Sequence, residues 1–324
     1  MHKKLALIIG VNSQDGSYMA DYLYSRGYHI YGTSRDIISI KRKWHKDTDV
    51  DLIQLNIFQF EQISNIINSI MPDEIYNFTA LTSGSDMYLR IDEIHHINGI
   101  FVSYILESIR KNKKKIRFFQ SSSREIFGVP KQFPQNENSL TSPRSPYGAA
   151  KLFSQNLTKI YREHYNLFAV SGILYNHESE RRGDSFVSKK ISKAAARIKF
   201  NLQTELILGD IDASRDWGFA GDFVEAIFLI MQNDQPDDYI IATGNEYKVR
   251  DFCYEAFDYL GLNYLDHVVI DKKLARRGEE KAHFIGDISK IRHDTGWEPK
   301  KKFNKIVQEM VENEIRNLEK NNEI

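Results

Sequence analysis

Short apolar runs alternate with amphipathic stretches through the first 175 residues of the chain. Each run has the length of one β-strand, and the stretches between them carry apolar residues at helical spacing. This alternation is typical of βαβ units, in which parallel strands form one sheet and crossover helices cover its faces. The predicted strands are Leu5–Gly10, His29–Ser34, Asp51–Asn56, Glu74–Ala80, Ile116–Ser122 and Phe168–Tyr175, and the predicted helices are Ser17–Arg26, Phe60–Ile70, Ile94–Arg110 and Gly148–Tyr165. The sequence therefore predicts an α/β fold with a doubly wound parallel sheet of the Rossmann type.

The regular alternation ends after Tyr175, and the later pattern predicts a second, smaller lobe. The predicted elements are a polar loop at Asn176–Ser185, strands at Glu205–Gly209 and Tyr239–Thr243, and helices at Phe186–Phe200, Asp222–Gln232, Val249–Gly261 and Lys302–Lys320. We expect residues 1–175 to form the Rossmann domain and residues 176–324 to form mainly a mixed α/β substrate-binding lobe. The two later strands indicate that the chain returns to the main sheet around residues 205–245.

The charge balance and the cysteine content exclude several classes of protein. The 324 residues include 44 Lys or Arg and 44 Asp or Glu, so no overall field favours nucleic acid or an anionic membrane. Cys253 is the only cysteine, which excludes an intramolecular disulfide and favours a reducing compartment. No stretch approaches the roughly 20 apolar residues that a membrane-spanning helix needs. We expect a soluble cytoplasmic protein with neither nucleic acid nor a membrane as partner.

The first predicted strand leads through a glycine-containing turn directly into a helix. A dinucleotide pyrophosphate binds the backbone N–H groups at such a helix N-terminus, and small residues are needed for its close approach. Gly10 and Gly16 are placed for this role, and Ser13 stands where such a turn has its middle glycine. Gln14 and Asp15 complete the candidate cofactor-binding turn. A plain β–turn–α corner remains the alternative, because the motif alone is weak.

The end of the second strand bears on the choice of cofactor. Asp36 lies 20 residues after Gly16, where an acid can hydrogen-bond the adenosine ribose hydroxyls. Its neighbour Arg35 can instead stack on adenine or meet a 2′-phosphate. Because a carboxylate repels a phosphate, the pair favours NAD over NADP.

A tyrosine and a lysine four residues apart begin the helix that follows the fifth strand. Tyr147 and Lys151 lie on one helix face, and we expect the ammonium to lower the pKa of the phenol enough for it to act as a base. One tyrosine–lysine pair with this spacing is about what chance would supply. The prediction therefore rests on the position of the pair, at the start of the helix that follows the fifth strand. Ser123 and Glu125 lie at the carboxyl end of the fifth strand, where open α/β sheets bind ligands. The alternative is that the serine caps a turn and Glu125 pairs with Arg124.

Longer strings around these residues resemble the extended short-chain dehydrogenase/reductases and, within them, the GDP-mannose 4,6-dehydratase family. The resemblance covers nearly the whole chain, and several of its strings are specific to that branch. It is densest in Gly16–Tyr18, Pro72–Asn77, Pro143–Leu152, Tyr165–Val170, Asn176–Ser179, Arg181–Gly183 and Arg215–Gly218.

The resemblance implies a role for each matching residue. Tyr147 would be the base for the sugar 4-hydroxyl, and Lys151 would tune it and hold the nicotinamide ribose. Ser123 would bond the 4-oxygen, and Glu125 would be the acid/base. The implied substrate-binding residues are Asn176, Arg182, Lys190, Arg215, Arg276 and Glu279. For His177 and Trp217 in the same strings we expect structural roles, and no metal site is expected.

The implied reaction converts GDP-mannose, or a close relative such as a GDP-manno-heptose, to the 4-keto-6-deoxy sugar with a tightly bound NAD or NADP. Hydride leaves C4, water leaves across C5 and C6, and the hydride returns to C6. The alternatives are a GDP-sugar 4-dehydrogenase or epimerase, and a dinucleotide-binding protein without turnover. A homodimer or homotetramer is implied.

The chain departs from the family pattern at several positions. Ser13 replaces a glycine, and Asp36 replaces the second arginine of a pair that binds the NADP phosphate. The segment Asp36–Asp51 is shorter than the family loop, which helps to form a subunit contact. Arg124 stands where a small residue is usual, and we expect this cation to lower the pKa of Glu125 and weaken it as a base.

Overall fold

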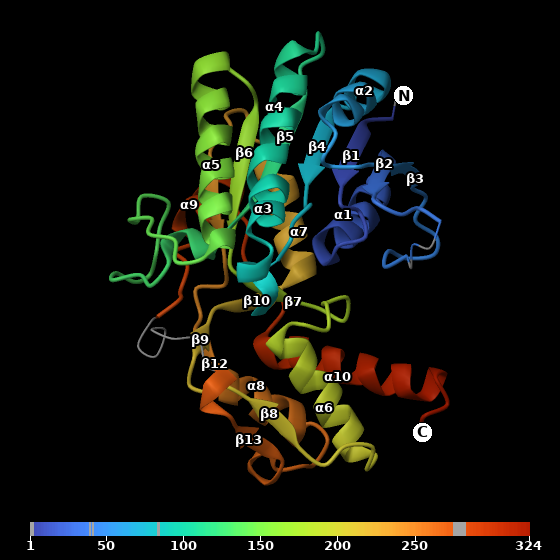
Figure 1. The fold of residues 1–324 in the computed structure, drawn as a ribbon, viewed down its shortest axis with the longest axis vertical. Coiled ribbons are helices and arrows are strands. Elements are labelled where there is room, and N and C mark those ends of the chain that lie inside the picture. Colours follow the sequence, from blue (N-terminus) through green and yellow to red (C-terminus); the bar gives the residue numbers. More distant parts are fainter. Residues whose placement is uncertain (1–2, 39, 41, 83–84, 275–282) are drawn as a thin grey trace.

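A parallel β-sheet forms the centre of the upper part of the molecule (Figure 1). The computed structural model describes residues 3–38, 40, 42–82, 85–274 and 283–324. Within these ranges the sheet has seven strands in the order β11-β6-β5-β4-β1-β2-β3, and every neighbouring pair is parallel. The strands are β1 (Leu5–Ile9), β2 (His29–Ser34), β3 (Asp51–Gln54), β4 (Glu74–Asn77), β5 (Arg117–Ser123), β6 (Ala169–Leu174) and β11 (Asp238–Ile241). The predicted doubly wound sheet is confirmed.

Helices cover both faces of this sheet because its strands are apolar on both sides. In β1, Ala6 and Ile8 face one core while Leu7 and Ile9 face the other. On the first side α1 packs beside α7, which packs beside α9; on the second, α4 packs between α2 and α5. These helices are α1 (Gln14–Tyr24), α7 (Ala220–Gln232), α9 (Ser289–Thr295), α2 (Phe60–Ile70), α4 (Phe101–Lys111) and α5 (Pro146–Tyr165). The predicted helix Ile94–Arg110 is α4 preceded by α3 (Ile91–His95) and a π-helical segment, η2 (His96–Ile100).

The lower part of the molecule is a helical cluster with small two-stranded sheets. Its core lies between α6 (Val187–Lys199), α8 (Val249–Asp258) and α10 (Phe303–Lys320). The small sheets pair β7 with β10, β9 with β12, and β8 with β13. Their bounds are β7 (Asn176–Glu178), β8 (Leu206–Leu208), β9 (Ser214–Arg215), β10 (Trp217–Phe219), β12 (Tyr247–Lys248) and β13 (Val268–Ile270). Short 3-10 turns are η1 (Ser85–Leu89), η3 (Arg124–Phe127), η4 (Tyr264–Asp266) and η5 (Lys272–Leu274).

Two of the segments predicted after Tyr175 differ in the structure. The segment predicted as a loop at Asn176–Ser185 begins with strand β7, whose three residues pair with β10 far along the chain. The strand predicted at Glu205–Gly209 is β8, but it pairs with β13 in the lower part rather than with the main sheet. Among the described residues after 175, it is β11 that joins the main sheet.

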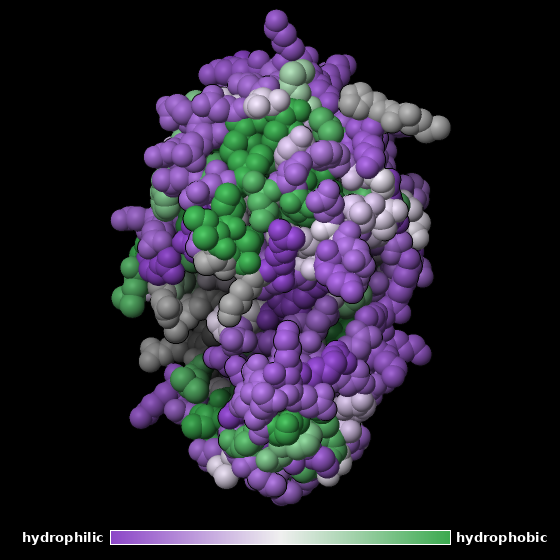
Figure 2. Space-filling view, turned by 90° about the vertical axis from the view of Figure 1, so that its right-hand side faces the viewer, coloured by the Kyte–Doolittle hydropathy of each residue, from purple (hydrophilic) through white to green (hydrophobic). Residues whose placement is uncertain are grey.

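The surface is mainly polar on the face that Figure 2 shows, with apolar side chains gathered in the upper half of the view, a smaller apolar patch near the bottom, and a recessed, polar middle. In the described part of the chain, no helix is both long enough and apolar enough to cross a membrane.

Candidate active site

The glycine turn after β1 has the tight geometry that a dinucleotide-binding turn requires. Gly10 has φ +83°, and a Cβ at this position would lie 3.0 Å from Oγ1 of Thr79. A Cβ on Gly16 would lie 2.3 Å from the carbonyl oxygen of Gly10, so a larger residue cannot be accommodated there. Ser13 caps α1, because its Oγ accepts a hydrogen bond from the N–H of Gly16 at 3.0 Å. Serine at the middle position therefore closes the turn without adding bulk.

The side chains of Gln14 and Asp15 connect this turn to strand β7 and the residue after it. Gln14 donates to the carbonyl oxygen of His177 at 3.0 Å and accepts from the hydroxyl of Ser179 at 2.8 Å. The Asp15 carboxylate lies 2.9 Å from Nε2 of His177. These two residues thus hold strand β7 against the glycine turn, a link that nothing in the local sequence indicated.

The Asp15–His177 pair is buried, and its charges stabilise each other. Burial alone would raise the pKa of Asp15, but the charge and hydrogen bond of His177 outweigh it and lower that pKa. Burial would likewise lower the pKa of His177, and Asp15 outweighs it and raises that pKa. His177 also stacks on Phe223 at 4.7 Å between ring centroids. Trp217 is buried and stacks on Phe303, so both residues make the packing contacts expected of structural roles.

Arg35 and Asp36 lie on the exposed segment after β2. The Asp36 carboxylate accepts a hydrogen bond from the N–H of Ile38 at 2.9 Å, and its carbonyl accepts from the hydroxyl of Ser34 at 3.0 Å. The acid is therefore held close to the carboxyl end of β2, beside the glycine turn of the neighbouring strand β1.

Helix α5 starts with a cap that fixes the position of the tyrosine and the lysine. Ser145 accepts a hydrogen bond from the N–H of Gly148 at 3.0 Å, and Pro146 is the first helical residue. The ammonium of Lys151 lies 5.7 Å from the ring centroid of Tyr147 and donates to the carbonyl oxygen of Ser121 at 2.7 Å. Burial lowers the pKa of Lys151 to about 8, against the opposing charge of Asp15.

The phenol of Tyr147 does not have the low pKa that we expected. Burial raises its pKa to about 12, the hydrogen bond with Ser123 acts in the lowering direction, and the charge of Glu125 acts in the raising direction. The prediction of a low pKa is wrong for this arrangement, because burial outweighs the lowering contributions, and the Lys151 ammonium donates its hydrogen bond to the Ser121 carbonyl. The hydrogen bond does, however, bring Ser123 and Tyr147 together as predicted from the strand end.

The strand end itself carries a buried ion pair. Ser123 caps η3 by accepting from the N–H of Glu125 at 3.3 Å. Nη2 of Arg124 donates to Oε1 of Glu125 at 2.8 Å, and the guanidinium carbon lies 4.0 Å from the ring centroid of Phe284. Ser123 therefore caps a turn and Glu125 pairs with Arg124, as the alternative interpretation expected. Both residues also lie close to Tyr147.

The predicted substrate-binding residues are spread over the lower part and its junction with the sheet. Asn176 is half-buried in β7, and Lys190 is exposed on α6. Arg182 lies 3.0 Å from Glu178 and over the ring of Phe186. Arg215, in β9, lies 5.0 Å from the ring of Phe284, the same ring that Arg124 covers. Two further predicted residues, Arg276 and Glu279, lie outside the described residues.

Phe284 and Asp216 are residues of this region that the sequence did not single out. Phe284 is buried and forms the platform for two arginines. Asp216 is fully buried, and its carboxylate accepts hydrogen bonds from Thr243, Gly244 and Gly286. Burial raises the pKa of Asp216 to about 6 against these hydrogen bonds. Asp216 thus joins the Arg215 strand to the loops that follow β11 and precede α9.

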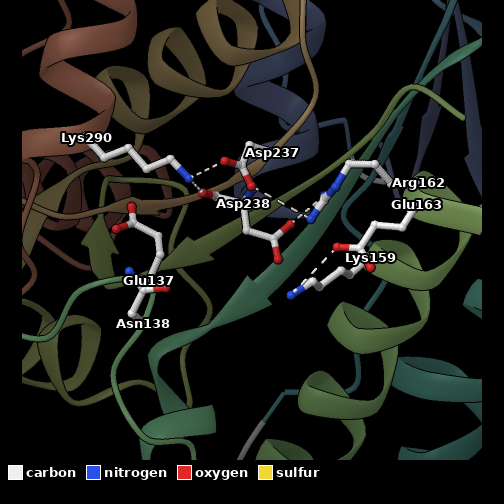
Figure 3. Close-up of a pocket in the computed structure, with 8 residues that line it drawn as sticks. All are labelled: Glu137, Asn138, Lys159, Arg162, Glu163, Asp237, Asp238 and Lys290. Atoms are coloured by element: carbon white, nitrogen blue, oxygen red, sulfur yellow. Dashed lines mark hydrogen bonds and ion pairs between the residues drawn. The ribbon is translucent and has the colours of Figure 1, made fainter. Parts of the chain in front are cut away.

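A pocket of about 390 Å³ lies away from these residues, at the β11 edge of the sheet (Figure 3). It is lined by Glu137, Asn138, Lys159, Arg162, Glu163, Asp237, Asp238 and Lys290. Lys159 lies eight residues after Lys151 on α5, which is roughly 12 Å along the helix. The pocket contains none of the predicted site residues, and its charged side chains are directed at one another.

The residues at the glycine turn fit a dinucleotide. The two glycines let β1 turn tightly into the N-terminus of α1, since a Cβ at either position would meet neighbouring protein atoms, and Oδ1 of Asn12 in the same turn is buried without a partner among the described residues. A bound group with hydrogen-bond donors would satisfy such an atom. In the described ranges, no cluster of His, Cys, Asp or Glu is arranged to hold a metal ion.

Comparison with known proteins supports the interpretation of this arrangement. The sequence family described as GDP-mannose 4,6 dehydratase matches residues 7–310. GDP-mannose 4,6 dehydratase 1 of Arabidopsis thaliana is 39% identical over 327 residues, covering 97% of this chain and 90% of that protein.

Solved structures with the same fold include nucleotide-sugar enzymes with bound cofactors. The dTDP-glucose 4,6-dehydratase of Bacillus anthracis in complex with NAD superimposes with a TM-score of 0.81 at 21% identity, covering 98% of each chain. RMD from Pseudomonas aeruginosa complexed with NADPH superimposes with a TM-score of 0.81 at 19% identity, covering 97% of this chain and 98% of that one. At these identities the likeness shows the fold.

Proposed function

The chain belongs to the GDP-mannose 4,6-dehydratase family, and we propose that it catalyses the 4,6-dehydration of a GDP-linked sugar. The observation that carries the proposal is the convergence of Ser123, Glu125 and Tyr147 at the carboxyl end of β5 and the start of α5. Lys151 is buried behind them with its ammonium on the β5 backbone. C4 oxidation needs a base that takes the 4-hydroxyl proton while hydride leaves C4, and water elimination needs a separate carboxylate.

The nicotinamide cofactor would lie along the glycine turn, held by the N-terminus of α1. Gly10, Ser13, Gln14, Asp15 and Gly16 form this binding turn. When bound, the cofactor supplies a hydride acceptor for C4 and a hydride donor for C6. Related folds bind NAD or NADPH. We propose NAD for this chain, because Asp36 would repel a 2′-phosphate, and Arg35 is the group that would favour NADP.

Tyr147 takes the proton of the sugar 4-hydroxyl, and Ser123 hydrogen-bonds the same oxygen. The pKa of about 12 means that Tyr147 is protonated before substrate binds, so the phenol starts as a hydrogen-bond donor. Lys151 is the neighbouring positive charge that stabilises the phenolate when it forms. Its pKa of about 8 leaves it largely cationic near neutral pH.

Glu125 is the base in the elimination step. Once C4 is a ketone, the hydrogen on C5 is acidic, and the Glu125 carboxylate removes it. The C5–H electrons form the C5=C6 bond as the 6-hydroxyl departs with a proton as water. Arg124 favours the ionised form of this carboxylate, since the two groups are 2.8 Å apart.

The GDP part of the substrate would lie across the lower part of the molecule, in which residues 176–324 form mainly the substrate lobe. The proposed contacts are Asn176, Arg182, Lys190, Arg215, Arg276 and Glu279. GDP-mannose and a GDP-manno-heptose are the proposed substrates, because nothing in the named residues separates a hexose from a heptose. The proposed site of action is the cytoplasm.

We also propose that two copies of the chain pair through the helices on the α4–α5 face of the sheet, as a homodimer or as half of a homotetramer. Ile100, Phe153 and Ile160 are large apolar side chains that are exposed on this face. Sedimentation of the purified protein distinguishes the two assemblies.

The test is a mass-spectrometric assay of the purified protein with GDP-mannose and with a GDP-manno-heptose. We expect a product lighter than the substrate by one water, with no net change in the cofactor. Release and identification of the cofactor after denaturation tests the choice of NAD, and recovery of NADP alone would contradict it.

The second candidate function is a GDP-sugar 4-dehydrogenase or epimerase. The observation that favours it is the ion pair between Arg124 and Glu125, which makes the carboxylate a weaker base. In this case the same assay gives a product lighter by two hydrogens with reduced cofactor, or an isomer of unchanged mass.

A further inference from the structure

Arg124 is a buried cation with hydrogen-bond donors left over. Its side chain is 6% exposed. A guanidinium carries five N–H donors, and among the described residues this one donates a single hydrogen bond, to Glu125. Donors of a buried guanidinium that meet neither protein nor water carry a large desolvation cost. The remaining donors are therefore left to water or to a bound molecule.

The remaining donors of Arg124 are not fully enclosed by the described residues. Of the described polar atoms that are fully enclosed without a partner, none belongs to Arg124. Its other nitrogens therefore keep some contact with solvent. Phe284 lies 4.0 Å from the guanidinium carbon and fixes the plane of the group by stacking. The donors are thus both oriented and accessible.

The position of these donors is set by the carboxylate beside them. Arg124 and Glu125 are joined at 2.8 Å, and Glu125 is the group assigned above to the C5 hydrogen. A sugar placed with C5 at Glu125 has its 6-oxygen two bonds beyond C5, which is within reach of a guanidinium in contact with that carboxylate. Tyr147 and Ser123 would contact the 4-oxygen, which is on the carbon next to C5.

We propose that Arg124 contacts the departing 6-oxygen of the substrate and stabilises the negative charge that develops on it during elimination. The proposal rests on the dehydratase function and adds a substrate-contacting residue to it. A guanidinium keeps its proton in proteins, so Arg124 acts as a hydrogen-bond donor and not as the acid. Glu125 takes the C5 proton, the C5–H electrons form the double bond, and the C6–O bond breaks. Glu125, now protonated, then gives a proton to the departing oxygen, which leaves as water.

This assignment also explains why a cation beside the base is compatible with catalysis. A carboxylate paired with a cation takes a proton less readily but returns it more readily. Arg124 therefore makes removal of the C5 proton by Glu125 less favourable. It makes the later step more favourable, because Glu125 then gives up the proton more readily and Arg124 stabilises the oxygen that receives it. Preorganised donors at a developing oxyanion are commonly worth about a hundredfold or more in rate.

The experiment separates the partial reactions in the enzyme with its bound cofactor and GDP-mannose in D2O. Single-turnover absorbance measures C4 oxidation. Deuterium at C5 of the recovered sugar, after quenching and borohydride reduction, measures proton removal by Glu125. The product lighter by one water measures elimination. For Arg124→Met we expect oxidation and C5 exchange within about threefold of the unaltered protein, and elimination slower by about a hundredfold.

Other variants supply the matched comparisons. Glu125→Gln should lose both C5 exchange and elimination while keeping C4 oxidation. Arg124→Lys keeps the charge but not the planar donor array, and we expect it to recover part of the elimination rate. Arg162→Met removes a buried arginine outside the site, and per folded molecule it should leave all three readouts unchanged. Melting temperature and cofactor content are compared for each variant.

Two outcomes would overturn the proposal. If Arg124→Met loses C5 exchange as fully as Glu125→Gln, Arg124 acts only by positioning the carboxylate. If Arg124→Met eliminates at the unaltered rate, Arg124 does not act on the leaving oxygen. If Arg124→Met does not fold, Arg124→Lys carries the same test, with C5 exchange retained and elimination reduced at least about tenfold. Absence of any product lighter by one water from the unaltered protein is a different result, which would contradict the proposed function itself.

Discussion

Two groups of charged side chains lie along helix α5, and they differ in whether their charges are fully paired. At the start of the helix, Lys151 and the nearby Arg124 are buried cations near Tyr147, and within the described part of the chain Arg124 has donors beyond its one hydrogen bond to Glu125. At the other end, Arg162 donates to Asp238 at 2.8 Å and to the carbonyl oxygen of Ala169 at 2.9 Å.

The charged side chains around Arg162 pair with one another at the β11 edge of the sheet. Lys290 donates to Asp237 at 2.6 Å and to the carbonyl oxygen of Asp238 at 2.8 Å (Figure 3). Glu137 accepts from the N–H of Ile240, a backbone donor of the edge strand β11. The charged side chains of this pocket form a structural network. At the end of β5, by contrast, the donors of Arg124 that no described residue accepts are available to a ligand. Substitutions near the start of α5 should therefore lower activity, and substitutions near its other end should lower stability.

The largest effect is expected for Tyr147→Phe. Removing the hydroxyl removes the group that takes the 4-hydroxyl proton, so C4 oxidation should fall by about a thousandfold or more. The melting temperature should change little, because the ring and its packing are kept. Single-turnover formation of reduced cofactor measures the rate. Tyr165→Phe, an exposed position at the end of α5, is the control, and an equal loss in both variants would contradict the assignment.

Arg162→Met should affect stability and not chemistry. It leaves the carboxylate of Asp238 partly buried without its partner, which costs about 3 kcal/mol in the free energy of unfolding. Denaturant unfolding measures this change, and the dehydration rate per folded molecule should stay the same. A normal free energy of unfolding with lost activity would reverse the roles given to the two groups.

The pH dependence of hydride transfer should report Lys151. Its pKa is lowered to about 8, so the ammonium fraction falls as pH rises through that value. If the cation assists Tyr147, kcat/KM for C4 oxidation falls above about pH 8. Lys151→Arg stays charged throughout, so its profile should be flat in this range even where its rate is lower. The same falling limb in both proteins would show that another group titrates.

The smallest effect is expected for Lys159→Met. Its ammonium lies 3.8 Å from Glu163, and both side chains are more than half exposed. Such a pair contributes at most about 0.5 kcal/mol, so neither unfolding nor dehydration should change measurably. A loss of activity here would mean that the pocket at the β11 edge takes part in the reaction.

The main sheet was predictable from the sequence because parallel strands buried on both faces are continuous apolar runs. The small strands were not, since β7 and β9 consist of two or three residues paired with segments distant in the chain. Within the site, the strand end after Ser122 and the start of α5 were placed correctly in the fold. Their roles in the reaction remain proposals.

The electrostatics of the site could not be predicted in the same way. The pKa of Tyr147 is raised mainly by burial, and the Lys151 ammonium donates to the Ser121 carbonyl; neither follows from a spacing of four residues. The contact between Arg124 and Phe284 joins positions that are distant in the chain, and no local pattern indicates it. The link between Asp15 and His177 is of the same kind.

Dehydration by internal hydride return is tested most directly with GDP-mannose that carries deuterium at C4. The mass spectrum of the product from the enzyme with its bound cofactor shows where the label goes. We expect a product lighter by one water that retains the deuterium at C6 of the same molecule. A product lighter by two hydrogens, with the deuterium on reduced cofactor, would contradict the proposed dehydratase function.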